Sequence, residues 1–403
     1  MLKTIVGGIA GIAIKSKMKK TKQVYLDNAA TTKVEPRVAK VMNTYLSKKY
    51  GNASSLHQKG QEARKAVEEA RHIIARSINA KPEEIIFTSG GTESNNLALK
   101  GLYFENKNKK HIITTKIEHE SILEVCRWLE KQGCKVSYLN VDKEGFVNPK
   151  DVEKAITPET LVVSIIHGNN EIGTLQNIEE IGKICRSKGV YFHVDACQAF
   201  TKTKIDIIKQ NIDLLTLNGH KIHGPKGVGA LFKREGIKIT PILHGGGHEK
   251  GLRSGTENVA GIVGFAEAVR IAKESDIRKM KNLRDYLIKE IMKIPNTKLN
   301  GPAGKNLEHR LCNNINVSFK NIDGEALLSS LDENGIFVST GSACASHRLE
   351  RSHVLKAIGL NDREINSAIR ISISKFTTKE ELEYFIKVLN VIVKKLRQIS
   401  PFV

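Results

Sequence analysis

The sequence has few of the features that mark secreted or membrane proteins. Its six cysteines are scattered, no two of them form a C-x-x-C pair, and aromatic residues make up only 5% of the chain. Cysteines in this arrangement do not predict a disulfide framework, so we expect a reducing, intracellular compartment. With 403 residues and 40% hydrophobic residues, the chain is predicted to form a globular protein of two or three domains.

Acidic residues are scarce relative to basic ones, which leaves a net charge of +21. Such an excess can mark a nucleic-acid-binding surface. However, no long Lys/Arg block interleaved with aromatic residues occurs beyond the N-terminus. The alternative, lysines spread over solvated faces, is therefore favoured, and we expect no stable nucleic-acid or membrane binding.

Residues 1–23 are basic and apolar and contain no acidic residue. Their apolar run from Ile5 to Ile14 is about half of the roughly 20 residues that span a bilayer. Lys15 and Lys17 stand where a secretory signal needs small residues. The segment therefore predicts neither a transmembrane helix nor a signal peptide. A weak interfacial anchor, an organellar presequence and a true start at Met18 stay open, and a cytoplasmic location is expected.

From about residue 60 onward, helical and strand patterns alternate. Residues 63–78 are apolar at helical spacing. Short apolar runs without polar alternation then recur at Ile85–Phe87, His111–Ile113, Leu161–Ile166, Val190–Val194 and Leu214–Leu217. Such runs, separated by helix-length segments, predict an α/β fold whose mostly parallel sheet is covered on both faces.

A charged helical stretch at 265–294 leads into a segment with Pro295 and Pro302, which indicates a domain boundary. We expect an N-terminal extension at 1–23, a large domain at 24–275 and a smaller C-terminal α/β domain at 276–403.

Lys221 follows the predicted strand at 214–217 and precedes a glycine-rich segment, while Asp195 ends the predicted strand at 190–194. In open α/β sheets, ligands bind at the carboxyl ends of the strands. Chemistry with pyridoxal 5′-phosphate (PLP) needs a lysine that forms an imine and a carboxylate that keeps the pyridine nitrogen protonated. Asp195 and Lys221 supply that pair.

Residues 88–95 (Thr-Ser-Gly-Gly-Thr-Glu-Ser-Asn) follow the predicted strand at 85–87. Glycines, hydroxyl groups and a helix N-terminus together can hold a phosphate. The spacing of a P-loop is absent, and taken alone the segment also fits an ordinary helix cap.

His244 and His248 are separated by three glycines, which argues against the helix that would place both histidines on one metal. No metal site is expected.

Several segments in chain order resemble the class V aminotransferase family. They are residues 25–32, 88–95, 169–173 and 253–258, the Glu118-His119 pair, and the Asp195 and Lys221 segments. Within that family, residues 339–344 (Ser-Thr-Gly-Ser-Ala-Cys) resemble the loop of the cysteine desulfurases of the NifS and IscS type. The resemblance runs from about Tyr25 to the end of the chain. It implies a type I PLP-dependent fold and conversion of L-cysteine to L-alanine, with the sulfur kept as a persulfide on Cys344.

The resemblance also implies a role for each matching residue. Lys221 would hold PLP and move the Cα proton, Asp195 would pair with the pyridine nitrogen, and His119 would stack on the ring. Asn170 and Arg370 would hold the substrate, because a planar guanidinium suits a carboxylate. The remaining cofactor contacts would come from Gly91, Thr92, Gln198, Asn218, Gly219 and His220, with Thr256 reaching in from the second subunit of a homodimer.

Cys344 lies among small residues, as a mobile nucleophile requires. A thiol with a pKa near ~8.5 is only slightly ionised at neutral pH, so we expect activation on arrival at the site, with His119 as a candidate. The sulfur acceptor would be an iron–sulfur scaffold or a tRNA-thiolation enzyme. The alternatives are a selenocysteine lyase or another class V PLP enzyme. A non-catalytic RNA-binding or sulfur-carrier protein would leave Lys221 and Asp195 unexplained.

Overall fold

A seven-stranded sheet organises the larger part of the chain, whose computed structural model describes residues 22–106, 108–340 and 351–400. The strand order is β2-β8-β7-β6-β5-β3-β4. The strands are β2 (Ile85–Thr88), β3 (His111–Thr115), β4 (Lys135–Leu139), β5 (Thr160–Ile166), β6 (Tyr191–Asp195), β7 (Leu214–Asn218) and β8 (Gly229–Lys233). Strands β4, β3, β5, β6 and β7 are parallel, and β8 runs antiparallel to both β7 and β2.

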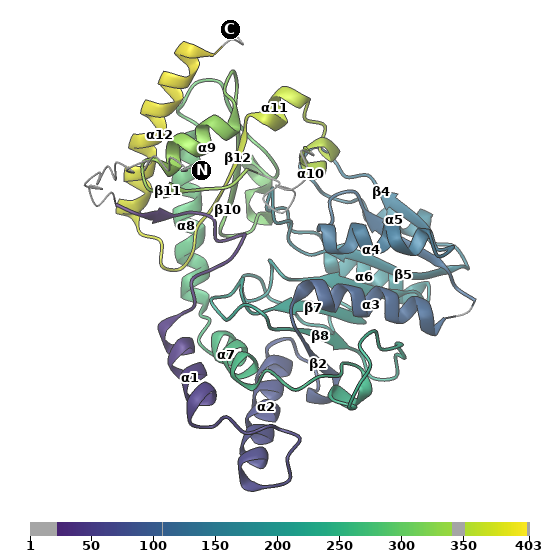
Figure 1. Cartoon of the computed structure of the whole chain (residues 1–403). Helices are drawn as coiled ribbons and strands as arrows, with labels where there is room; N and C mark the ends of the chain where they lie inside the picture. Colours follow the sequence, from purple (N-terminus) through teal and green to yellow (C-terminus); the bar gives the residue numbers. More distant parts are fainter. Residues whose placement is uncertain (1–21, 107, 341–350, 401–403) are drawn as a thin grey trace, which may run out of the picture.

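Neighbouring residues of each strand contribute to different cores, because successive side chains point to opposite faces of a sheet. In β2, Ile86 packs in one hydrophobic cluster while Ile85 and Phe87 pack in another. Helices cover both faces (Figure 1). Helices α3 (Gly91–Glu105) and α4 (Glu120–Glu130) cover one face, and α2 (Gln58–Ser77), α6 (Ile178–Ser187) and α7 (Val259–Arg270) cover the other. The predicted doubly covered, mostly parallel sheet is therefore confirmed.

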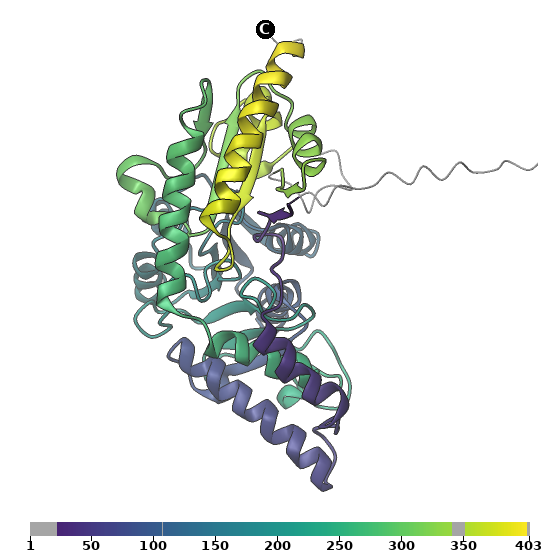
Figure 2. The same ribbon diagram turned by 90° about the vertical axis from the view of Figure 1, so that its left-hand side faces the viewer.

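A second sheet organises the C-terminal part. Strands β9 (Thr297–Leu299), β10 (Asn314–Phe319) and β12 (Ala368–Ser372) are antiparallel, in the order β12-β10-β9. Helices α8 (Glu274–Ile291) and α12 (Lys379–Ile399) run side by side against this sheet (Figure 2). The remaining elements are α1 (Pro36–Ser47), α5 (Pro149–Ala155), α9 (Gly324–Asp332), α10 (His353–Ala357), α11 (Asp362–Asn366) and the 3-10 helices η1 (Pro82–Glu84), η2 (Glu249–Gly251) and η3 (Gly304–His309).

The first strand belongs to this second core. Strand β1 (Val24–Tyr25) pairs in parallel with β11 (Ile336–Phe337), and Val24 and Leu26 pack in the C-terminal hydrophobic cluster. This packing differs from the sequence prediction, which placed the chain from residue 24 in the large domain. Two-residue strands carry too short a pattern to reveal a long-range partner.

The predicted helical stretch at 265–294 is two helices. After α7 ends, Lys273 adopts an extended conformation, with φ −129° and ψ 143°, and α8 begins at the next residue. The break lies where the chain passes from one core to the other, since α8 buries Met280 and Leu287 in the C-terminal cluster. Across residues 22–106, 108–340 and 351–400, no helix has the length and apolar character to cross a bilayer.

Candidate functional site

A cavity of about 320 Å³ lies at the carboxyl ends of β5, β6 and β7. Its size falls within the range of small-molecule sites, and its position is the one that open α/β sheets use for ligands. Ten of the sequence-predicted site residues line it: Gly91, Thr92, His119, Asn170, Asp195, Gln198, Asn218, His220, Lys221 and Arg370. The fold therefore brings together residues that are up to 279 positions apart in the chain, from Gly91 to Arg370.

Asp195 is the last residue of β6, and its side chain is fixed by two donors. The Asn95 amide donates to Oδ2 at 2.9 Å, and the backbone N–H of Cys197 donates to Oδ1 at 2.9 Å. The residue is only 3% exposed. A carboxylate held in this way presents a defined acceptor edge to the cavity.

Lys221 lies just beyond β7, and its amine reaches the N-terminal segment of the chain. Its Nζ donates to the carbonyl oxygen of Ala30 at 2.6 Å and also to that of Ala29. Backbone acceptors therefore hold the lysine at the cavity.

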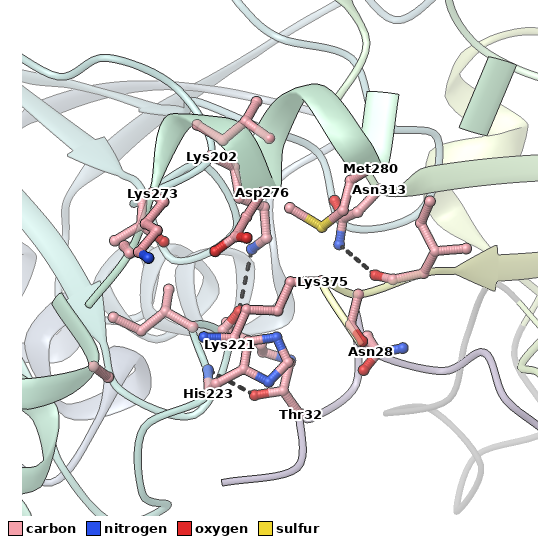
Figure 3. Close-up of a pocket in the computed structure, with 17 residues that line it drawn as sticks. Asn28, Thr32, Lys202, Lys221, His223, Lys273, Asp276, Met280, Asn313 and Lys375 are labelled. Atoms are coloured by element: carbon pink, nitrogen blue, oxygen red, sulfur yellow. Dashed lines mark hydrogen bonds between the residues drawn. The ribbon is translucent and has the colours of Figure 1, made fainter. Parts of the chain in front are cut away.

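Lys202 lies next to Lys221 in a second, smaller pocket of about 40 Å³ (Figure 3). This pocket lies between the large sheet and the C-terminal part of the chain. The Lys202 Nζ donates to the carbonyl oxygens of Gln198 at 2.8 Å and Lys221 at 3.2 Å. Burial lowers the pKa of Lys202 to about 8. The two loops that follow β6 and β7 are thus tied together by one side chain.

The N-terminus of α3 opens into the cavity at Gly91 and Thr92. Its N-cap residue, Gly90, supplies no side-chain cap, so amide groups of the first turn are left for a ligand, and the helix dipole favours an anion there. A Cβ atom on Gly91 would lie 2.5 Å from the Cys197 sulfur. Nearby, Asn218 Oδ1 is a buried acceptor without a partner among the described residues.

His119 and Glu118 stand at the start of α4. Burial lowers the pKa of the His119 imidazole, and Lys221 lowers it further. Burial raises the pKa of Glu118 to about 8. Both side chains are therefore predominantly uncharged near neutral pH. Burial likewise lowers the pKa of His220, to about 4.

Arg370 brings the C-terminal sheet into the site. It lies in β12 and donates to Asp27 Oδ1 at 2.9 Å and to the carbonyl oxygen of Asn170 at 3.2 Å. Its Nε is buried and has no partner within the part of the chain that the structure describes. A free N–H beside two satisfied ones suits a carboxylate ligand.

Two described site residues that the sequence predicts do not line this cavity, and a third lies outside the described residues. Gly219 is buried beside it but does not line it, and Thr256 is exposed and lies outside it. Cys344 falls in residues 341–350, outside the described residues. The structure does place Ser352 and His353, which follow that segment, in the cavity wall.

Sequence reasoning missed several residues that the site uses. Ser121 and Lys202 contact predicted site residues but carried no recognisable pattern beyond lying a few positions from them, and Asn95 was part of the quoted 88–95 segment without a role of its own. Glu171 was part of the quoted 169–173 segment without a role; it is buried and accepts a hydrogen bond from Ser352 Oγ. Within the described ranges, no group of three or more His, Cys, Asp or Glu side chains has metal-binding geometry.

Comparison with known proteins finds relatives that match most of the chain. The aminotransferase class-V family model matches residues 24–385. The cysteine desulfurase IscS of Dictyoglomus turgidum is 49% identical over 386 residues, covering 94% of this chain and 97% of that protein. The mitochondrial cysteine desulfurase of Saccharomyces cerevisiae is 47% identical over 388 residues, covering 94% of this chain and 77% of that protein. A solved NifS-like protein has a TM-score of 0.87 at 41% identity, covering 93% of this chain and 100% of that one. The chain belongs to the class V aminotransferase family, among its cysteine desulfurases.

Proposed function

We propose that this protein is a cysteine desulfurase, which converts L-cysteine to L-alanine and keeps the sulfur as a persulfide on Cys344. The observation that carries the proposal is the convergence of Lys221, Asp195 and His119 on one cavity. The family supports it, since a solved relative, SspA at 38% identity and a TM-score of 0.79, is described as a complex with cysteine.

The residues of the cavity fit PLP. An amine, a buried carboxylate and an uncapped helix N-terminus are the groups that PLP needs, and Asn218 Oδ1 is an acceptor still without a partner among the described residues. Lys221 would hold the cofactor covalently, Asp195 would face its pyridine nitrogen, and Gly91 and Thr92 would meet its phosphate. When bound, PLP supplies an electron sink that stabilises negative charge at the substrate Cα.

The protein's own residues perform the remaining tasks. Arg370 binds the substrate carboxylate through its Nε and orients the amino acid. Asp195 holds the proton at the pyridine nitrogen, and Lys221 moves the Cα proton. The Cys344 thiolate then attacks the substrate sulfur, so that an S–S bond forms while the Cβ–S bond breaks. The three-carbon product takes up protons and leaves as alanine.

The proposal is tested with purified protein under anaerobic conditions. L-cysteine with a reductant should give sulfide and alanine in equal amounts. Cys344→Ala should lower both by at least about 100-fold, since the nucleophile is lost, while the cofactor absorbance remains. Without a reductant, the peptide that carries Cys344 should gain one sulfur atom. Cys126→Ala, at a buried cysteine on α4, is the matched control and should retain activity.

If Cys344→Ala released sulfide at the wild-type rate, a lyase that expels sulfide directly would replace this proposal. The same variant distinguishes the selenocysteine lyase alternative. Selenium leaves carbon more readily than sulfur, so a selenocysteine lyase would retain part of its activity on selenocysteine without Cys344.

Assembly, acceptor and location complete the proposal. We infer a homodimer in which Thr256 reaches the partner's cofactor phosphate; in its own subunit it is exposed and outside the cavity. An iron–sulfur scaffold or a tRNA-thiolation enzyme would receive the sulfur, in the cytoplasm. The names of the IscS relatives support the acceptor only at the level of the family.

A further inference from the structure

A continuous hydrogen-bond chain joins two sides of the cavity. The Asn95 amide nitrogen donates to Asp195 Oδ2 at 2.9 Å and to Ser121 Oγ at 2.8 Å. Ser121 Oγ in turn lies 2.8 Å from His119 Nδ1, and the backbone N–H of Ser121 donates to the same nitrogen at 3.1 Å. Asn95 and Ser121 are buried, and His119 is partly exposed where it lines the cavity.

The direction of each hydrogen bond follows from the chemistry of the groups. An ionised carboxylate only accepts, so the Asn95 amide nitrogen, not its oxygen, must face Asp195. The second hydrogen of that nitrogen points to Ser121 Oγ. The hydroxyl hydrogen of Ser121 is then available for His119 Nδ1, which also faces the backbone N–H of Ser121.

His119 Nδ1 therefore accepts two hydrogen bonds and carries no proton. A proton on Nδ1 would point directly at the Ser121 backbone N–H. A neutral imidazole with an unprotonated Nδ1 has its proton on Nε2. Burial and Lys221 lower the pKa of His119, against opposing effects of Asp195 and Glu120, and His353 lowers it slightly further. Nε2 has no hydrogen-bond partner among the described residues.

We propose that Asn95 and Ser121 are positioning residues that hold His119 as the neutral Nε2–H tautomer. In this form His119 donates a hydrogen bond toward a ligand in the cavity. It cannot take a proton through Nε2, because that nitrogen's lone pair belongs to the aromatic ring. This differs from the sequence expectation that His119 activates the Cys344 thiol as a base.

The inference rests on the proposed function only for the identity of the ligand. The tautomer itself is a property of the resting holoenzyme and can be measured without turnover. The direct test is long-range ¹H–¹⁵N NMR of holoenzyme labelled with ¹⁵N-histidine. The chain has 13 histidines, so the His119→Gln variant identifies the signal by its loss. We expect an unprotonated Nδ1 and a protonated Nε2 in the wild type at neutral pH. A protonated Nδ1 overturns the proposal.

Variants then test the two positioning residues. Ser121→Ala removes a donor to the neutral ring, and a hydrogen bond to the neutral form disfavours the charged form. The pKa of His119 should therefore rise, and the acidic limb of the kcat profile should move to higher pH. We expect kcat at neutral pH to fall about tenfold, because less of His119 keeps the Nε2–H form that donates to the ligand, with KM changed less than about twofold.

Asn95→Ala should also raise the pKa of His119. Without the Asn95 amide that donates to its oxygen, the Ser121 hydroxyl is no longer fixed with its hydrogen toward His119 Nδ1. Ser121→Thr keeps a hydroxyl and should restore both the NMR pattern and the pH profile. Asn96→Ala is the matched control: Asn96 neighbours Asn95 on α3 but is partly exposed, and its amide donates to the carbonyl oxygen of Thr92 on the same helix. A Ser121→Ala enzyme with an unchanged tautomer and pH profile contradicts the proposal. If the wild-type protein made no alanine from L-cysteine, the proposed function would be wrong. The tautomer of His119 measured by NMR would not be affected by that result.

Discussion

Glu118 shows how strongly burial acts on a single side chain of the site. Burial raises the pKa of its carboxyl from the ordinary value of 4.5 to about 8, although Thr115 Oγ1 donates to it at 2.6 Å. Between these two pH values the folded protein binds more protons at this group than the unfolded chain. Stability is therefore greatest below the lower value and decreases as pH rises toward the higher one.

Glu118→Gln should abolish this pH dependence, because an amide does not titrate. From about pH 5 to 8, the free energy of unfolding of the wild type should fall relative to that of Glu118→Gln. The expected slope is about 1.4 kcal/mol per pH unit. Urea unfolding of both proteins across that range measures it. Glu124→Gln, on the exposed face of α4, the helix that begins just after Glu118, is the control and should follow the wild type. Parallel curves for Glu118→Gln and wild type would show that the carboxyl is ionised in the folded state.

Arg370 allows a second test at the residue scale. Its guanidinium joins Asp27 and the Asn170 carbonyl and leaves Nε for a ligand. Lysine keeps the charge but loses the planar fork, so Arg370→Lys should raise KM for L-cysteine about tenfold or more while kcat changes less. Asp27→Asn, which loosens the same side chain, should raise KM to a smaller degree. An unchanged KM in Arg370→Lys would place carboxylate recognition elsewhere.

At the scale of elements, the sequence predicts those strands that are buried on both faces. In β2, β3 and β5 every residue is buried, so their apolar runs stand out. Strand β4 lies at the edge of the sheet, is partly exposed and mixes polar with apolar residues, and β8 begins with glycine. Their patterns do not separate them from loops. The break between α7 and α8 is also hidden, because no proline or glycine marks it.

The same reasoning explains which site residues the sequence reveals. Asp195 ends β6 and Lys221 lies three residues beyond β7, so both lie at a predictable edge of the sheet. Asn95 and Ser121 contact the site only because α3 and α4 pack together on one face. A pattern along the chain does not contain that contact. The roles of Arg370 and His119 were available only through resemblance to a family.

Gly182 of α6 tests how closely a helix packs against its neighbouring loop. Alanine in a helix is normally more stable than glycine, by up to about 1 kcal/mol. Here, however, a Cβ atom would lie 1.9 Å from the backbone carbonyl oxygen of Gln210. Overpacking of this kind costs about 1–3 kcal/mol or more, so Gly182→Ala should be destabilising in urea unfolding. In the control Gly264→Ala the new atom meets the flexible Met42 side chain, and the cost should be smaller. If the two variants lost the same free energy of unfolding, close packing against the Gln210 backbone would not be the cause of the loss at Gly182.

At the scale of the whole molecule, the cavity lies between two hydrophobic cores. The large sheet supplies Asp195 and Asn218, the second sheet supplies Arg370, and the N-terminal segment supplies Ala29. Strand β1 packs in the second core, so the segment that follows it connects both cores past Lys221. Ten of the predicted contacts line the cavity within one subunit, and in the proposed dimer Thr256 would come from the other subunit.

The segment that carries Thr256 and a nearby exposed apolar surface are the features on which the predicted dimer depends. The segment that carries Thr256 is held at Arg253, which donates to Glu93 at 2.8 Å, and at Asn258, which caps α7. Large apolar side chains are exposed around the connection of α1 and α2, with Tyr50 69% and Leu56 84% exposed. Exposed apolar surface of this kind marks protein interfaces, and a two-fold dimer would bring the same surface of each subunit together.

We therefore expect light scattering to give twice the subunit mass. Tyr50→Asp combined with Leu56→Asp should weaken the dimer and lower activity with dilution, because charged groups do not pack in an apolar contact. Thr256→Ala should leave the dimer intact and weaken only the binding of the cofactor, measured by its release during dialysis. A fully active monomer at the concentration of the assay would remove Thr256 from the site and confine all cofactor contacts to one subunit.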